Sequence, residues 1–303
     1  MKKHGTRLSV IMPVYNEQAR IAQALESVLF QDVDFQYEVI VIDDRSTDDT
    51  AAIVRSYQEM FPNITLQVNE TNRGKGYGFM RAYAMAVGEY FHVLDGDDVF
   101  LSYNKLQRQV DFLDAHDDYV AVGHNSLILF DDQRVSLVCR GLEPQSFAYD
   151  DCIRNRLYCH TSALMYRKIH KTLPDAFLAK PLRGDSAVYF YHVFHSKKKV
   201  MYWPEVLSLY NFHGNGLWSG MSEQERGHLN CQVLQALLDL VIVDQSLEEY
   251  TVVKRRLEQL RSARSTWPAR RQQAMTLDEV LSQCGRTAAK VFDPQVRSKA
   301  FRG

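Results

Sequence analysis

The sequence contains no long hydrophobic run. Its richest apolar stretch, Val233 to Val243, is interrupted by Asp239, whereas a membrane-spanning helix needs about 20 mostly apolar residues. We interpret this stretch as a buried helix. The first residues, Met1 to Leu8, also lack the apolar core of a signal peptide and lead directly into a predicted strand. Both absences predict a cytoplasmic protein.

Cysteine is scarce, and a glycine-rich N-terminal loop is missing. The five cysteines are odd in number and contain no Cys-x-x-Cys pair, so neither a zinc site nor a disulfide framework is supported. Scattered cysteines of this kind are typical of a reducing compartment. Pro13-Val-Tyr-Asn-Glu17 occupies the place where a dinucleotide-binding fold has Gly-x-Gly-x-x-Gly. The missing loop argues against an NAD enzyme and against a sugar nucleotidyltransferase.

The chain carries little net charge, but that charge is unevenly distributed. A net charge of −1 over 303 residues predicts no general attraction to nucleic acid. Residues 251–303 contain twelve Lys and Arg against four acids, which makes this tail +8 and the remainder −9. Trp267 lies among arginines, as in segments that rest on anionic membranes. A solvated helical face is the alternative. The imbalance predicts a separate surface task for the tail.

The first hundred residues alternate regularly between strand and helix patterns. Ser46, with Asp49 three residues later, is the predicted N-cap of the second helix. Alternation with short turns predicts βαβ units in a mainly parallel sheet. The predicted strands are 8–12, 37–42, 64–68 and 90–94, and the predicted helices are 21–30, 46–60 and 75–87.

The alternation ends after Asp98, and the second half is irregular. Its predicted helices are 101–115 and 185–195, and its predicted strands are 119–130, 134–139, 162–166 and 206–211. Helical patterns resume over 223–260, and a last helix is predicted at 277–284. We therefore predict an α/β fold with a mainly parallel first half (1–98), an α+β second half (99–220) and a helical basic region (221–303).

An acidic turn, Asp95-Gly-Asp-Asp98, follows the fourth predicted strand. Open α/β sheets bind ligands at the carboxyl ends of their strands. Three carboxylates on one turn are too crowded to stay ionised comfortably unless a cation joins them. Oxygen ligands favour Mg²⁺ or Mn²⁺ over zinc. An acidic turn that only caps a following helix is the simpler alternative.

Four motifs occur in a fixed order along the chain. They are Ser9-Val-Ile-Met-Pro-Val-Tyr-Asn-Glu17, Val41-Ile-Asp-Asp44 with Ser46, Asn72-Arg-Gly-Lys75, and Gly88-Glu-Tyr with Leu94-Asp-Gly-Asp-Asp98. In this order and spacing, over roughly residues 7–215, the sequence resembles the family-2 glycosyltransferases, inverting enzymes with the glycosyltransferase-A fold. The resemblance implies a nucleotide-sugar donor, usually UDP-linked, a divalent metal and a carboxylate base. It also implies a catalytic domain of residues 1–220, with a nucleotide-sugar-binding half and an acceptor-binding half.

The resemblance assigns the donor site to the first three motifs and the acidic turn. Tyr15 and the backbone before it would hold the uracil, or Tyr15 only packs the turn. Asp43 would accept the uracil N3–H, and Asp44 would either bind the donor or cap the turn before Ser46. Asp95 falls on the ribose side. The predicted donor-binding residues are Pro13, Val14, Tyr15, Glu17, Asp43, Asp44, Lys75, Asp95 and Gly96.

The Asn72–Lys75 turn opens a helix, which favours phosphate binding. Lys75 would add a point charge there. This chain has Gly78-Phe79-Met80 where many members of the family have Ala-Arg-Asn. The nucleotide contact of that arginine is therefore open, and Arg73 and Arg81 are alternatives to Lys75.

The resemblance also implies a metal and a base. Asp97 would bind Mn²⁺ or Mg²⁺, His213 is a second candidate ligand or a structural histidine, and Asp98 would cap the next helix or orient its neighbours. Asp185 is the predicted base, with a helix N-cap as the alternative. His160 is a weaker candidate and is left out of the predicted site. The family's usual first acid is replaced by Gly184.

Taken with these residues, the resemblance implies a metal-dependent inverting hexosyl- or N-acetylhexosaminyltransferase. Its acceptor would be a hydroxyl of a surface polysaccharide or of a lipid-linked saccharide. The departures at Gly184 and Phe79 keep an alternative open, namely a catalytically silent member that binds nucleotide sugar or serves as a scaffold. Donor turnover separates the two.

Overall fold

The structure is a computed structural model that describes residues 5–132, 134–139, 143–153, 159–174 and 184–213. It also describes nine single positions between 221 and 258, and only the backbone of residues 153 and 184–186. The first half consists of β1 (Thr6–Val14), α1 (Ile21–Leu29), β2 (Gln36–Asp43), α2 (Thr50–Met60), β3 (Ile64–Val68), α3 (Lys75–Met85) and β4 (Tyr90–Val93). The predicted alternation is confirmed.

The second half is a mixture of short and long elements. These are β5 (Val99–Phe100), α4 (Lys105–Ala115), β6 (Tyr119–Phe130), β7 (Val135–Leu137), β8 (Gln145–Phe147), α5 (Tyr149–Ile153), the 3₁₀ turn η1 (Thr161–Ala163), β9 (Met165–Arg167), α6 (Gly184–Ser196) and β10 (Lys199–Phe212). The predicted α+β character of this half is confirmed.

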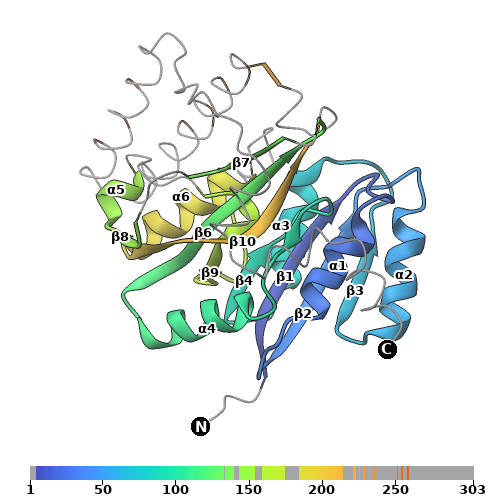
Figure 1. The fold of residues 1–303 in the computed structure, drawn as a ribbon, viewed down its shortest axis with the longest axis horizontal. Helices are drawn as coiled ribbons and strands as arrows, with labels where there is room; N and C mark the ends of the chain where they lie inside the picture. Colours follow the sequence, from blue (N-terminus) through green and yellow to red (C-terminus); the bar gives the residue numbers. More distant parts are fainter. Residues whose placement is uncertain are drawn as a thin grey trace.

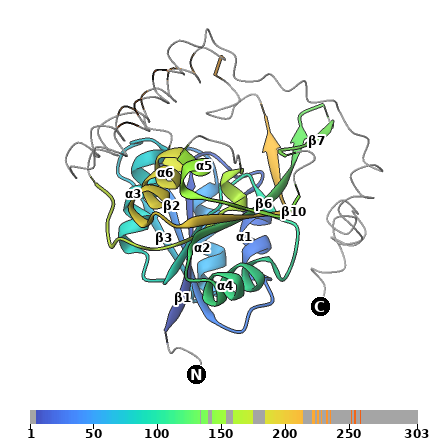
Figure 2. The same ribbon diagram turned by 90° about the vertical axis from the view of Figure 1, so that its left-hand side faces the viewer.

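One sheet connects the two halves. Its strand order is β3-β2-β1-β4-β9-β6-β10-β5, with β7 paired to β6 and β8 paired to β10. Strands β1 to β4 pair in parallel, and β9 runs antiparallel between β4 and β6. Strands β6 and β10 pair in parallel with each other and extend past the helices together with β7 (Figure 2). The carboxyl ends of β1, β2, β4, β6 and β10 therefore face the same edge of the sheet.

Helices cover both faces of this sheet (Figure 1). Side chains of a strand alternate between faces, and β1 shows this clearly. Leu8, Val10 and Met12 pack in one buried cluster with α1, α2 and α4. Ile11 belongs to a second cluster, with α3 and α6. Because both faces are covered, the strands consist of nearly continuous buried apolar residues, as is usual for parallel sheets.

The structure corrects the prediction for the start of the second helix. α2 begins at Thr50, and Asp49 occupies the N-cap position without a side-chain hydrogen bond. The Ser46 hydroxyl instead accepts a hydrogen bond from the Asn16 backbone N–H at 2.9 Å. The predicted cap was wrong because this serine contacts a neighbouring loop.

Several boundaries in the second half also differ from the prediction. The predicted helix 101–115 begins only at Lys105. The backbone before it bonds to other segments, because the Leu101 N–H donates to Leu207 O at 2.9 Å and Tyr103 O accepts from the Asp32 N–H at 2.7 Å. The predicted strand 206–211 is the second part of β10, whose pairing with β6 is interrupted by a bulge between Trp203 and Val206. Strand β8 and helix α5 were not predicted. These elements depend on pairing with distant segments, which local patterns do not report.

The C-terminal region is described only at isolated positions. From 225 onward the described positions, up to 258, are helical, while the predicted helix 277–284, Trp267 and most of the basic tail lie outside the described residues. In the part of the chain that is described, no helix is both long and apolar enough to cross a membrane. The division of the chain at 98 and 220 stays a prediction.

Candidate active site

The predicted site residues come from strand ends that meet at one edge of the sheet. Val14 at the end of β1 pairs with Asp43 at the end of β2. On the other side of β1, the Leu94 N–H donates to Ile11 O at 3.0 Å, which places the acidic turn next to β1. His213 directly follows β10 and reaches the same turn. The topology thus gathers residues from both halves of the sequence.

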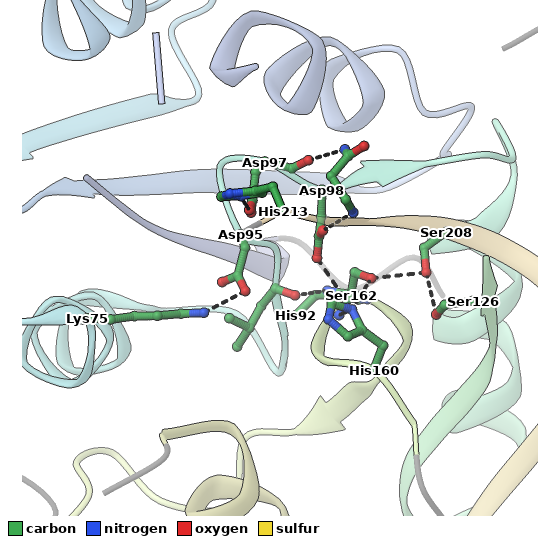
Figure 3. Close-up of polar contacts among 12 residues, drawn as sticks. Lys75, His92, Asp95, Asp97, Asp98, Ser126, His160, Ser162, Ser208 and His213 are labelled. Atoms are coloured by element: carbon green, nitrogen blue, oxygen red, sulfur yellow. Dashed lines mark hydrogen bonds and ion pairs between the residues drawn. The ribbon is translucent and has the colours of Figure 1, made fainter. Parts of the chain in front are cut away.

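Each carboxylate of the acidic turn has a different partner (Figure 3). Lys75 Nζ lies 2.5 Å from Asp95 Oδ2. His213 Nε2 donates to Asp97 Oδ2 at 2.9 Å, across 116 residues of sequence. Asp98 is fully buried and lies 3.4 Å from His160 Nδ1. One cationic or imidazole side chain therefore contacts each acid.

Asp97 and His213 form a half-buried pair that Glu17 joins. One carboxylate oxygen of Glu17, one of Asp97 and one ring nitrogen of His213 lie within 4.8 Å of one another. The hydrogen bond to Asp97 raises the pKa of His213. Burial opposes ionisation of Asp97, but the His213 hydrogen bond and the charge of Lys75 lower the Asp97 pKa. The pair therefore favours an ionised Asp97.

The surroundings of Glu17 and Asp98 raise the pKa of both carboxyl groups. Burial, followed by the charge of Asp97, raises the pKa of Glu17 to about 7. Burial, followed by the charges of Asp97 and Asp95, raises the pKa of Asp98 well above its usual value. The crowding of acidic groups expected from the sequence is therefore present, and Asp97 stays ionised more easily than Glu17 or Asp98.

Asp98 belongs to a buried polar network and does not cap a helix. The residue in the N-cap position of α4 is Asn104. The Asp98 Oδ1 atom accepts from the Asn211 backbone N–H at 3.3 Å. His160 contacts Asp98 and Ser162, with 2.8 Å between His160 Nδ1 and Ser162 Oγ, and its ring stacks on Tyr210 at 4.0 Å. The alternative that Asp98 orients its neighbours fits these contacts.

This network continues away from the acidic turn. Ser162 Oγ donates to Ser208 Oγ at 3.0 Å, and Ser208 Oγ lies 2.8 Å from Ser126 Oγ (Figure 3). His160 is thus a site residue that the sequence reasoning left out. A single histidine beside Thr161 and Ser162 gives no local signal, because its partner Asp98 is distant in sequence.

The two acids at the end of β2 have separate tasks. Asp43 Oδ1 accepts from the Ser46 N–H at 2.8 Å, while the buried Asp43 Oδ2 has no hydrogen-bond partner among the described residues. A buried acceptor of this kind is costly unless a ligand donor satisfies it. The hydrogen bond to Oδ1 shows that Asp43 caps the Ser46 turn, so the alternative that Asp44 caps it is wrong.

Asp44 instead holds the Asn72–Lys75 loop. Its carboxylate accepts from the Arg73 N–H at 2.9 Å, from the Gly74 N–H at 2.6 Å and from Asn69 Nδ2 at 2.8 Å. Gly74 has a positive φ of 86°, a conformation that glycine adopts at little cost. The buried carboxylate of Asp44 therefore holds the loop that carries Lys75 through its backbone N–H groups.

The arginine alternatives are engaged elsewhere. Arg81 donates to Asn69 Oδ1 at 2.7 Å and to Gln67 Oε1 at 2.8 Å. The Arg73 guanidinium lies 3.6 Å from the centre of the Tyr77 ring. Phe79, where many family members have arginine, is buried in the core. Of the basic residues considered for the diphosphate, Lys75 is the one whose described contact is with the acidic turn.

The remaining predicted residues lie at the end of β1 and at the start of α6. Pro13 and Val14 are buried in β1, while the Tyr15 side chain is 45% exposed beside them and accessible to a ligand. Asp185 lies in the first turn of α6, but its side chain lies outside the described residues. Its roles as base or cap therefore both stay predictions.

The donor set around Asp97 fits a divalent metal. Two carboxylates and one imidazole suit Mn²⁺, and the hard oxygen ligands suit Mg²⁺ as well. A second grouping, formed by Asp95, Asp97 and Asp98, also brings one ligand atom from each residue within 4.8 Å of the others. Asp97 is common to both groupings, which supports it as the central ligand.

Comparison with known proteins identifies the family. The family model described as "Glycosyl transferase family 2" matches residues 9–173, more than half of the chain. The chain therefore belongs to this family, and the resemblance inferred from the four motifs is confirmed.

Two relatives illustrate the match. An uncharacterised protein of Mycobacterium tuberculosis is 29% identical over 245 residues, covering 77% of this chain and 68% of the relative. A Bacillus subtilis protein provisionally named as the teichuronic acid biosynthesis glycosyltransferase TuaG is 31% identical over 150 residues. That match covers 50% of this chain and 58% of the relative.

Solved structures show the same fold. TarS 1-349 of Staphylococcus aureus in complex with UDP-GlcNAc has a TM-score of 0.60 at 19% identity, over 84% of this chain and 71% of that one. Mannosyltransferase PcManGT of Pyrobaculum calidifontis, in complex with GDP-Man and Mn²⁺, has a TM-score of 0.55 at 18% identity, over 99% and 84%. The predicted α/β glycosyltransferase-A fold is confirmed.

Proposed function

We propose that this protein is an inverting glycosyltransferase that moves a hexosyl or N-acetylhexosaminyl group from a UDP-sugar to an acceptor hydroxyl. The observation that carries the proposal is the contact of His213 with Asp97 at the carboxyl edge of the sheet. Open α/β sheets bind their ligands at this edge, and the chain belongs to a family of glycosyltransferases, so a nucleotide diphosphate would bind there. The buried Asp43 Oδ2 has no hydrogen-bond partner among the described residues, which supports a ligand that offers an N–H group, as uracil does.

Asp97 and His213 would hold the metal ion, Mn²⁺ or Mg²⁺. When bound, this ion supplies positive charge that stabilises the departing diphosphate. Lys75 lies beside Asp95 at the same turn and would add a second positive charge on that side. Tyr15 is exposed at the end of β1, and its ring would stack on the uracil of the donor.

Asp185 would perform the proton transfer. In an inverting reaction, the acceptor oxygen attacks the anomeric carbon on the face opposite to the departing UDP, and a carboxylate takes the proton from that oxygen. Asp185 is the one acid near the expected position, at the start of α6. The acceptor would be a surface polysaccharide or a lipid-linked saccharide, and the name of the relative TuaG supports this class.

A screen of nucleotide sugars for metal-dependent hydrolysis tests the proposal without a known acceptor. We expect UDP release from at least one UDP-sugar in the presence of Mn²⁺ or Mg²⁺, and none in EDTA. GDP-linked sugars serve as the comparison, because one structural neighbour binds GDP-Man. Tight donor binding without turnover, even with candidate acceptors, would favour the alternative, a catalytically silent member that binds nucleotide sugar or acts as a scaffold.

The basic tail would contact the anionic inner face of the cell membrane, so the protein would be cytoplasmic and peripheral. Each Lys or Arg near such a surface contributes about 1 kcal/mol. We expect the full chain to sediment with anionic but not neutral liposomes. The binding should fade as salt rises, because the Debye length falls from about 10 Å at 0.1 M to about 3 Å at 1 M.

A charge variant of the full chain provides the control for the tail. Replacing Arg264, Arg270 and Arg271 by Gln removes three of the twelve basic residues of the tail without shortening the protein. This variant should bind anionic liposomes more weakly than the wild type. Equal sedimentation of the two proteins, or no sedimentation of either, would instead favour a solvated helical face.

A further inference from the structure

Glu17 lies next to the candidate metal site, although it belongs to a different loop. It follows β1, whereas Asp97 follows β4 and His213 follows β10. Its carboxylate nevertheless comes within 4.8 Å of both ligand atoms. The chain thus brings three residues that can bind a metal together from three strand ends.

The backbone around Glu17 is held in place by the loop after β2. The Glu17 N–H donates to Thr50 Oγ1 at 2.7 Å. Asn16 has a positive φ of 55°, and its side-chain oxygen accepts from the Thr47 N–H at 2.8 Å. A left-handed conformation is tolerated by asparagine better than by most residues. The turn at Asn16 directs the Glu17 side chain toward the acidic turn, and these hydrogen bonds hold the Glu17 backbone in place.

Gly96 provides the space that the Glu17 side chain occupies. A Cβ atom added at Gly96 would lie 3.2 Å from Glu17 Cγ and 2.8 Å from Val14 Cγ1. The stem of Glu17 therefore packs directly against the backbone of the acidic turn. The missing side chain at Gly96 allows the carboxylate to lie beside Asp97 without displacement of the turn.

The charge of this group calls for a cation. The Asp97 and His213 side chains are only 16% and 13% exposed, and Glu17 is also partly buried. Two carboxylates so close together repel each other in a partly desolvated site. The nearby Lys75 forms its ion pair with Asp95, which is not one of these three residues. A divalent ion among Glu17, Asp97 and His213 would replace this repulsion by attraction.

We propose that Glu17 is a third protein ligand of the metal, so that the ion binds before the nucleotide arrives. Magnesium sites commonly rely on one or two carboxylates plus substrate phosphates, whereas three protein ligands form a site without the donor. The inference rests on the proposed metal-dependent function and assigns Glu17 to the metal in place of the donor contact implied by the resemblance.

A Mn²⁺ titration of the full-length protein without nucleotide tests the proposal, with free Mn²⁺ measured by its EPR signal. We expect one site in the wild type. In Glu17→Gln the Mn²⁺ affinity should fall at least tenfold. Loss of a residue that only hydrogen-bonds to a metal ligand already lowers metal affinity by about 10–100-fold, and a direct ligand should matter at least as much. Glu59→Gln, an equal change of charge at an exposed position of α2, should bind Mn²⁺ like the wild type.

Thermal unfolding separates a ligand from a structural residue. A ligand stabilises only the folded state that binds it, so Mn²⁺ should raise the melting temperature of the wild type more than that of Glu17→Gln. Without metal, the variant should melt at the same temperature as the wild type or higher, since one repelling charge is gone. A variant that melts lower with and without Mn²⁺, by the same amount, would show a structural role and overturn the proposal.

The outcomes distinguish this inference from the proposed function. Mn²⁺ binding that appears only with UDP, and that Glu17→Gln leaves intact, would overturn the three-ligand site and leave a metal-dependent transferase standing. If Glu17→Gln binds Mn²⁺ normally but binds UDP more weakly, Glu17 contacts the donor and not the metal, and the proposal is overturned. No Mn²⁺ binding in either state would remove the metal from both proposals.

Discussion

Replacing Asp97 by Asn should remove most of the UDP affinity that Mn²⁺ or Mg²⁺ provides. Asp97 belongs to both groups of candidate ligands, and its pKa is lowered by the His213 hydrogen bond and by Lys75 despite its burial. Asparagine keeps the shape of the side chain but lacks the negative charge that attracts the ion. Turnover should fall by about 10²-fold or more, as for other losses of charge stabilisation in a transition state.

Calorimetric titration with UDP, in Mn²⁺ and in EDTA, measures this effect directly. The wild type should bind more tightly in Mn²⁺, whereas the variant should bind with nearly the same affinity in both solutions. Asp111→Asn, on the exposed side of α4, is the matched control and should retain the wild-type difference. Equal UDP affinity of the wild type in Mn²⁺ and EDTA would contradict a metal role for Asp97.

Replacing Asp185 by Asn should lower the rate of sugar transfer by roughly 10²–10⁴, the usual contribution of a general base. Asparagine is nearly isosteric with aspartate but cannot take the proton from the acceptor. Donor affinity should change little, because Asp185 is expected to face the acceptor.

The same substitution distinguishes the base from a helix cap. Asparagine is about as good an N-cap as aspartate, so the variant should keep the melting temperature of the wild type whether or not the residue caps α6. Unaltered stability with greatly reduced transfer would identify the base. Transfer at the wild-type rate would return Asp185 to a capping role, and measurement of both quantities on one preparation decides between them.

The first half of the fold could be predicted because its information is local. Strands β1 to β4 are short apolar runs separated by helical patterns, and each pairs in parallel with a strand from the same hundred residues. The second half could not be predicted as well. β5, with only Val99 and Phe100, is a strand because β10 lies beside it, and β8 pairs with the same long strand.

The candidate site shows a similar division. The sequence identified the acidic turn, the two acids at the end of β2 and Lys75 from their motifs. It did not indicate that Asp43 caps the Ser46 turn while Asp44 holds the next loop. Asp43 is the last residue of β2 and Asp44 is the first residue after it, so the two neighbouring acids reach different surroundings. Only their contacts show that, within the described part of the chain, Asp43 keeps an oxygen without a hydrogen-bond partner.

By itself, the sequence determined the kind of protein. Its order of strands and helices predicted the α/β fold, and four short motifs indicated the family, because turns at strand ends need particular residues close together in the chain. The tertiary structure decided the partners of these residues. His213 reaches Asp97 because β10 runs parallel to β6 in the same sheet, and Glu17 reaches the same carboxylate because β1 lies next to β4. Such pairings depend on the assembly of distant strands, and no local pattern encodes the final distances.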